Sequence, residues 1–88
     1  MTEATFYILL SLIHPSHGYS MMQSIKELSK GRLIMGPGTL YGVLTRMNNE
    51  GLIGLVDEEG RKKTYHITAL GLEALKEEYQ RLNNQVDD

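Results

Sequence analysis

The sequence predicts a small, mainly α-helical domain of the α+β class, with its elements in the order α-α-α-β-β-α. Three observations support this prediction. Apolar residues recur at helical spacing in three stretches before residue 50, apolar and polar residues alternate on either side of a charged turn within residues 52–67, and helical spacing then returns. The chain has 88 residues, which is enough for one small core.

The first helix is expected over residues 3–13 and ends before His14-Pro15, because a residue that precedes proline is disfavoured in the α region. Its inward face, at i, i+3, i+4 and i+7, is expected to comprise Phe6, Leu9, Leu10 and Ile13. Tyr7, Ile8 and Leu12 lie on other sides of the cylinder, so this helix is apolar nearly all round. Such a helix is buried on more than one side. A second chain is therefore expected to cover part of it.

A second helix is expected over about residues 19–29, after a turn at HPSHGYS, residues 14–20. Met21 or Met22 is expected to face inward, together with Ile25 and Leu28. Lys30-Gly31 is expected to end this helix, because glycine suits the C-terminal capping position.

The third helix has a sharp start and a sharp stop. Gly36 is expected to be its N-cap, Pro37 its first residue and Gly51 its C-terminal stop. Its inward stripe is predicted to be Leu40, Val43, Leu44 and Met47. The opposite side is small and polar, with Tyr41 on its flank, and comprises Gly38, Thr39, Gly42, Thr45, Arg46 and Asn49.

A β-hairpin is expected over residues 52–67, with DEEG, residues 57–60, as its charged turn. Its alternating apolar residues are Ile53, Leu55, Tyr65 and Ile67.

The last helix is expected over about residues 69–84, with Thr68 as its N-cap. Its apolar residues follow one another in steps of three and four, which is the heptad spacing of a coiled-coil seam. They are Leu72, Leu75, Tyr79, Leu82 and Val86. Leu70 and Ala74 lie off this seam and are expected to face the domain's own core. The seam itself is expected to pair with a second copy of the chain.

Three helices followed by a β-hairpin is the order of a winged helix-turn-helix, in which the third helix enters the DNA major groove and the hairpin, the wing, lies over the phosphates. Residues 1–68 are therefore predicted to form a DNA-binding domain, and residues 69–88 a C-terminal dimerisation helix with a polar tail. The charges agree with this division, because residues 19–68 carry a balance of +2 within a chain of net charge −2, whereas residues 69–88 carry −3.

Three motifs resemble the PadR-like winged-helix transcriptional regulators: HGY (17–19), GPGTLYGVLTRMNNEGLI (36–53) and GRKKTYHITALG (60–71). They occur in the family's order and cover most of residues 8–75, and the chain resembles the family's short form. Gly36, Gly42 and Thr64 stand where the family commonly has Ser, Pro and an aromatic residue.

The resemblance implies a homodimeric regulator, interpreted as a repressor, on a near-palindromic double-stranded DNA operator. The DNA-binding residues it implies are Gly38, Thr39, Tyr41, Gly42, Thr45, Arg46, Arg61, Lys62 and Lys63. The dimer interface it implies, on the first and last helices, comprises Phe6, Leu9, Leu10, Leu72, Leu75, Tyr79 and Leu82.

Two alternatives stay open at this point. A winged-helix module that binds another protein and no DNA would fit the net charge of −2 and the acidic last helix. A member with a small-molecule effector between the helices of a dimer, lined by Tyr7 and Tyr79, is also compatible with the sequence.

No cofactor, metal site or enzymatic activity is expected. The chain has no cysteine, His14, His17 and His66 lack complementary ligands, and no nucleophile–base pair can be assembled. No apolar run reaches the roughly 20 residues of a membrane span, and no basic leader precedes the first apolar run. A cytoplasmic protein without a membrane partner is therefore expected.

Overall fold

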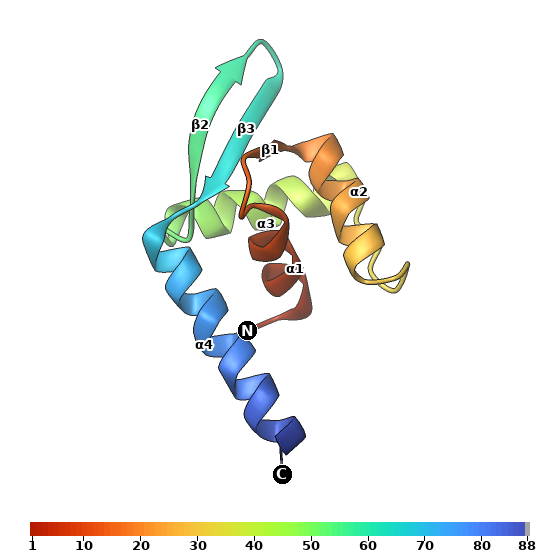
Figure 1. Ribbon diagram of the computed structural model, residues 1–88. Helices are drawn as coiled ribbons and strands as arrows, with labels where there is room; N and C mark the ends of the chain where they lie inside the picture. The colour runs from red at the N-terminus through yellow and green to blue at the C-terminus, as the bar shows by residue number, and fades with distance from the viewer. Residues whose placement is uncertain (88) are drawn as a thin grey trace.

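The computed structural model describes residues 1–87, and the environment of side chains as far as residue 83. The elements in chain order are α1 (Glu3–Ser11), β1 (Ser16–His17), α2 (Gly18–Leu28), α3 (Pro37–Asn49), β2 (Ile53–Glu59), β3 (Lys62–Ile67) and α4 (Ala69–Asp87). Figure 1 shows the β2–β3 wing and the end of α4 projecting in opposite directions from a body of helices. The predicted α+β class and element order are confirmed, with the short strand β1 added. No helix within residues 1–87 has the length and hydropathy that a membrane crossing needs.

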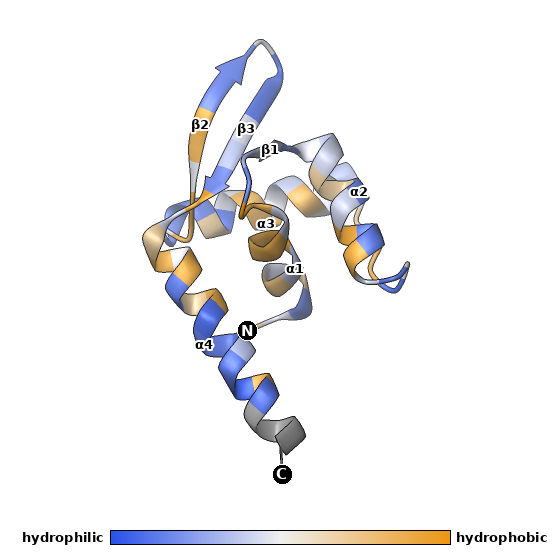
Figure 2. Cartoon of the chain, in the orientation of Figure 1, coloured by the Kyte–Doolittle hydropathy of each residue, from blue (hydrophilic) through white to orange (hydrophobic). Residues whose placement is uncertain are grey.

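The core lies where the helices meet and the wing begins. Its buried apolar residues come from all four helices, the α2–α3 loop and β2, and are Ile8, Leu9, Leu12, Met21, Ile25, Met35, Leu40, Leu44, Met47, Ile53 and Leu75. Figure 2 shows hydrophobic residues where α1 and α3 meet and hydrophilic residues over most of the wing. The wing is therefore an extension of the domain held at its base.

Helix α1 buries a different face from the one predicted. Thr2 caps it, accepting a hydrogen bond from the Thr5 backbone N–H at 3.2 Å, and the helix ends at Ser11, two residues earlier than expected. Its buried residues, with the C-cap, are Thr5, Ile8, Leu9 and Leu12. Of the predicted inward face, Leu9 is buried, but Phe6 and Leu10 are partly exposed and Ile13 is exposed. Both faces have the same spacing, so periodicity alone did not distinguish them.

Helices α2 and α3 follow their predicted patterns more closely. Met21 and Ile25 of α2 are fully buried, but Leu28, predicted to face inward, is 48% exposed. In α3, Gly36 is the N-cap and Pro37 the first residue, as predicted. Leu40, Leu44 and Met47 are fully buried and Val43 is partly buried. Gly51 follows the helix with φ of +80°, a left-handed conformation that glycine adopts without strain.

The three strands form one antiparallel sheet in the order β1-β3-β2. The register pairs Ile53 with Ile67 and Leu55 with Tyr65, and a bulge between Leu55 and Asp57 then shifts it. Residues 57–59 continue the strand beyond the bulge, paired with residues 62–64, and the turn is formed by Gly60 and Arg61, with Gly60 at φ of +62°. The prediction that residues 57–60 form the turn is therefore wrong.

Helix α4 begins against the end of α3. Thr68 Oγ1 donates to the Gly51 carbonyl at 2.6 Å and accepts from the Gly71 N–H at 3.1 Å, which confirms its capping role. Leu70, predicted to face the core, is 54% exposed, and Leu75 takes the core position instead. Leu75 joins α4 to the same core as the other helices, and the C-terminal end of α4 projects away from the body of helices (Figure 1).

Candidate nucleic-acid interface

The outward surface of α3 is bare and polar. All six predicted DNA-contacting residues of this helix are exposed: Gly38, Thr39, Tyr41, Gly42, Thr45 and Arg46. Nothing lies within 4 Å of the position that a Cβ atom would occupy on Gly38 or Gly42. At these two positions the helix backbone can therefore approach a flat partner closely.

Thr45 has part of its hydrogen-bonding capacity free. Its hydroxyl donates to the Tyr41 carbonyl one turn earlier, at 2.9 Å, which fixes the direction of the side chain. The Oγ1 lone pairs remain available to a donor, and the exposed methyl group can make apolar contacts. This combination suits contact with base edges in a groove.

Tyr41 connects two of the sequence motifs. A Cβ atom on Gly18 would lie 2.3 Å from the Tyr41 hydroxyl oxygen and 2.8 Å from Cζ, so the tyrosine ring rests directly on the Gly18 backbone. The ring is nevertheless 41% exposed. The glycine of HGY thus makes room for the tyrosine of PGTLY, and the contact holds that ring at the edge of the outward surface of α3.

Replacement of Gly18 by alanine is expected to displace the Tyr41 hydroxyl while leaving the fold intact, because the tip of an exposed side chain can swing away. We expect Gly18→Ala to lower the free energy of unfolding by only about 1 kcal/mol. In a DNA-binding assay, Gly18→Ala is expected to behave as Tyr41→Phe does, and the double variant should differ no more from the wild type than either single one. Additive losses in filter binding would show that Gly18 acts independently of Tyr41.

Arg46 is exposed, and its terminal nitrogens are engaged by neighbouring side chains. Its two terminal nitrogens donate to Glu50 Oε1 at 3.1 Å and to Thr5 Oγ1 of α1 at 3.0 Å. The pair with Glu50 has the i, i+4 spacing of an ion pair on a helix surface, and the contact with α1 adds to it. A pairing with Thr5, 41 residues away, was not detectable from sequence spacing.

The basic residues of the wing are exposed but do not share one face. Directly opposed residues lie on the same face of a ribbon and neighbours along a strand alternate. Lys63, opposite Glu58, therefore shares a face with Tyr65, whereas Lys62, opposite Glu59, lies on the other face. None of the ion pairs within the described residues joins these lysines to the acids of β2, residues 57–59, which form the acidic strand. Both lysines are thus free to meet phosphates, from different sides of the wing.

A second exposed surface runs along α1 and α4. A groove of about 270 Å³ between them is lined by Leu10, Ile13, Leu72, Leu75, Lys76, Tyr79 and Gln80. Tyr79 is 59% exposed, and Leu72 and Leu82 are also exposed. Leu9 and Leu75, predicted to be interface residues, are buried in the chain's own core and have little surface to offer a partner. Val86, the last seam position, falls outside the residues whose side chains are described.

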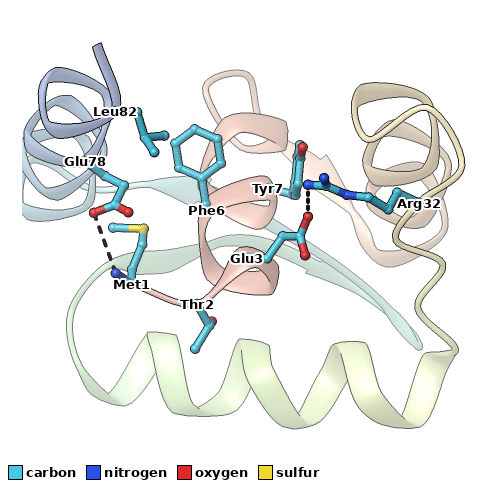
Figure 3. Close-up of a pocket in the computed structure, with 8 residues that line it drawn as sticks. All are labelled: Met1, Thr2, Glu3, Phe6, Tyr7, Arg32, Glu78 and Leu82. Carbon is cyan, nitrogen blue, oxygen red and sulfur yellow. Dashed lines mark hydrogen bonds and ion pairs between the residues drawn. The ribbon is translucent and has the colours of Figure 1, made fainter. Parts of the chain in front are cut away.

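A hollow of about 430 Å³ lies at the start of α1, beside this surface. Figure 3 shows Phe6 of α1 and Leu82 of α4 pointing toward one another across it. On one side of the hollow the Met1 ammonium pairs with Glu78, and on the other side Arg32 pairs with Glu3. Arg81, which donates to Glu78 at 2.6 Å, lowers the pKa of that carboxyl. The carboxylate therefore stays ionised near neutral pH. Within the described residues, no cluster of His, Cys, Asp or Glu could hold a metal ion.

Residues 8–77 match the profile of the transcriptional regulator PadR-like family. Over 62 residues, the chain is 36% identical to the transcriptional regulator YqjI of Escherichia coli K12, covering 70% of this chain and 30% of that protein. The curated relatives are much longer, and the chain spans 22–30% of the length of the first ones it matches.

Solved structures agree with the sequence comparison. A PadR family transcriptional regulator from Eggerthella lenta superposes with a TM-score of 0.75 at 25% identity, over 93% of this chain and 70% of that one. RosR of H. salinarum superposes with a TM-score of 0.84 at 21% identity, over 97% of this chain and 76% of that one. The similarity to RosR supports the fold alone.

Proposed function

Because this chain belongs to the transcriptional regulator PadR-like family, we propose that it binds DNA in a sequence-specific manner as a homodimeric repressor of the cytoplasm. In this proposal α3 enters the major groove and the wing contacts the phosphate backbone. The observation that carries the proposal is the outward surface of α3, where two open glycines and Thr45 adjoin Tyr41, held in place by Gly18. Beyond Tyr41 this surface has no large exposed apolar residue, which disfavours a protein partner on the same surface.

The charge distribution supports a nucleic-acid partner. Arg61, Lys62 and Lys63 project on the wing, away from the acidic α4. The acids of β2 lie opposite these bases in the ribbon, which limits the sequence-independent attraction that every duplex would otherwise exert. Specificity is then left to contacts made by α3 with base edges.

The α1–α4 surface supports a dimer. Its apolar residues Leu10, Leu72, Tyr79 and Leu82 are partly or largely exposed in the single chain, and one small core at this chain length is marginal. Two-fold pairing through this surface would present two α3 helices to successive major grooves, about 34–36 Å apart, so the operator should be nearly palindromic.

Selection of bound duplexes from a random DNA pool, at two salt concentrations, tests the proposed function. We expect enrichment of one near-palindromic sequence with a fixed half-site spacing, and binding that weakens steeply as salt rises. Enrichment of no sequence at low salt would reject the proposal. An alternative in which the chain binds only another protein predicts that negative result.

The dimer itself gives a separate prediction. Tyr79→Arg places a charge on the exposed seam, and we expect it to produce monomers in sedimentation equilibrium and to lower operator affinity by at least about tenfold. Ile34→Arg is the matched control, because Ile34 is also a highly exposed apolar residue but lies in the α2–α3 loop. A dimer that survives Tyr79→Arg, or is lost equally in both variants, would contradict the assignment of this surface.

A further inference from the structure

Arg46 forms a side-chain bridge between α3 and α1. One terminal nitrogen donates to Thr5 Oγ1 at 3.0 Å, and the other to Glu50 Oε1 at 3.1 Å. Thr5 is only 5% exposed, so its hydroxyl oxygen has little access to water. The same oxygen accepts from the Thr2 hydroxyl at 2.9 Å. Figure 3 shows Thr2 on the side of α1 that faces α3, which is the side the bridge reaches.

The planar guanidinium of Arg46 makes this bridge sensitive to the relative orientation of the two helices. The guanidinium is planar and its donors are fixed relative to one another, so binding two acceptors at once restricts where the acceptors can lie. Glu50 is the C-cap of α3, whereas Thr5 belongs to the first turns of α1. The bridge therefore constrains how the C-terminal half of α3 is rotated and tilted on α1.

Helix α1 also carries part of the surface through which the dimer is proposed to form. Phe6 follows Thr5 directly and points into the hollow shared with Leu82 of α4 (Figure 3). Thr5 faces α3 and Phe6 faces α4, so α1 lies between the recognition helix and the proposed dimer surface. Any change in the angle between α1 and α3 would alter the separation and tilt of two recognition helices in a dimer.

We propose that Arg46 is a positioning residue that sets the angle of α3 on α1 through Thr5, and thereby the half-site spacing that the dimer accepts. This inference rests on the proposed DNA-binding function. It assigns to Arg46 an effect on DNA binding without a contact to a base. Both of its terminal nitrogens are engaged by Glu50 and Thr5, which hold the guanidinium toward α1 and restrict where its remaining N–H donors can reach.

Three variants test the bridge. Thr5→Val removes the acceptor at nearly constant volume, inside the protein and away from the outward surface of α3. Arg46→Ala removes the donors, and Arg46→Lys keeps the charge without the planar fork. Each is measured against duplexes carrying the selected operator with its half-site spacing changed by one and two base pairs.

We expect Thr5→Val and Arg46→Ala each to lower affinity for the selected operator by about fivefold and to reduce the discrimination between spacings. The double variant should lose no more operator affinity than either single variant. Arg46→Lys should fail to restore the discrimination between spacings. All variants should select the same bases as the wild type. Urea unfolding and titration of the active fraction, carried out on every variant, separate these effects from reduced stability. A purely structural bridge would change stability and leave spacing discrimination as it is.

Two matched controls are available in the chain. Ser11→Ala removes a hydroxyl from α1 whose bond, to the Ile8 carbonyl, stays within that helix. Arg81→Ala removes an arginine whose pair with Glu78 stays within α4. Both should leave spacing discrimination unchanged.

The outcomes separate the two proposals. If Arg46→Ala changes the selected bases while Thr5→Val behaves as the wild type, DNA binding stands and the positioning role is overturned. Unchanged spacing discrimination in both variants overturns it as well. If the wild-type chain selects no sequence at all, the proposed function fails and the positioning role fails with it.

Discussion

Replacement of Gly71 by alanine is expected to unfold much of the protein near physiological temperature. A Cβ atom at this position would lie 2.1 Å from the Leu52 carbonyl oxygen and 2.9 Å from Ile67 Cγ1. The Leu52 carbonyl cannot easily retreat, because it is backbone and already accepts the Thr68 N–H at 3.1 Å. Helix α4 would have to move away from the α3–β2 connection, and Leu75 would leave the core with it.

We expect Gly71→Ala to lower the free energy of unfolding by about 3 kcal/mol or more, and Tm by at least about 12 °C in a domain of this size. Thermal unfolding followed by circular dichroism measures the change. Gly42→Ala is the matched control, since it is also a helical glycine but has nothing within 4 Å of its Cβ position. Intrinsic helix propensity should stabilise both alanine variants by up to about 1 kcal/mol. If Gly71→Ala lowers the free energy of unfolding while Gly42→Ala raises it, the difference is due to the tertiary contact at Gly71. Equal stability of the two variants would refute the close contact at Gly71.

Neutralising the wing bases is expected to weaken binding to every DNA duplex. Changing Arg61, Lys62 and Lys63 together to alanine removes three exposed cations that no intramolecular ion pair within the described residues engages. Affinity for operator and unrelated DNA should both fall, by at least about tenfold at moderate salt. The slope of log affinity against log salt should flatten by about 0.9 for each phosphate that the wing no longer neutralises. Titrations at several salt concentrations measure both quantities.

The acidic strand supplies the matched control for the wing. Changing Asp57→Asn, Glu58→Gln and Glu59→Gln together keeps the shape of the ribbon and removes negative charge, so affinity should rise for all duplexes. Single changes of Lys62 and Lys63 should differ in effect, because these lysines lie on opposite faces. A triple alanine variant with an unchanged salt slope would exclude the wing from the phosphate contacts.

The ends of several elements could be predicted because their determinants are local. Proline at the first position of α3 and glycine at left-handed positions such as Gly51 reflect steric limits of individual residues. The Thr68 cap is equally local, since it depends on a hydroxyl three residues before an amide. The buried stripe of α3 was predictable as well, because this helix has a single apolar face.

Features that depend on distant partners were missed. Strand β1 has two residues, too few for a periodic signal, and exists because Ser16 and His17 pair with β3. The charged DEEG stretch was taken as the turn, whereas its three acids pair with β3 beyond the bulge that follows Leu55, and only Gly60 belongs to the turn. Arg46 had a suitable local partner in Glu50, and its contact with Thr5 required α1 and α3 to be packed together.

The sequence by itself determined the class of the fold, the order of its elements and the family, because capping residues, apolar periodicity and short motifs act within a few residues of one another. Tertiary structure alone decided which side of α1, which is apolar nearly all round, enters the core and which side stays exposed. Several apolar stripes of that helix were equally competent to be buried. The choice was made by packing against α2, α3 and α4, since burial depends on what lies opposite a side chain and not on its spacing along the chain.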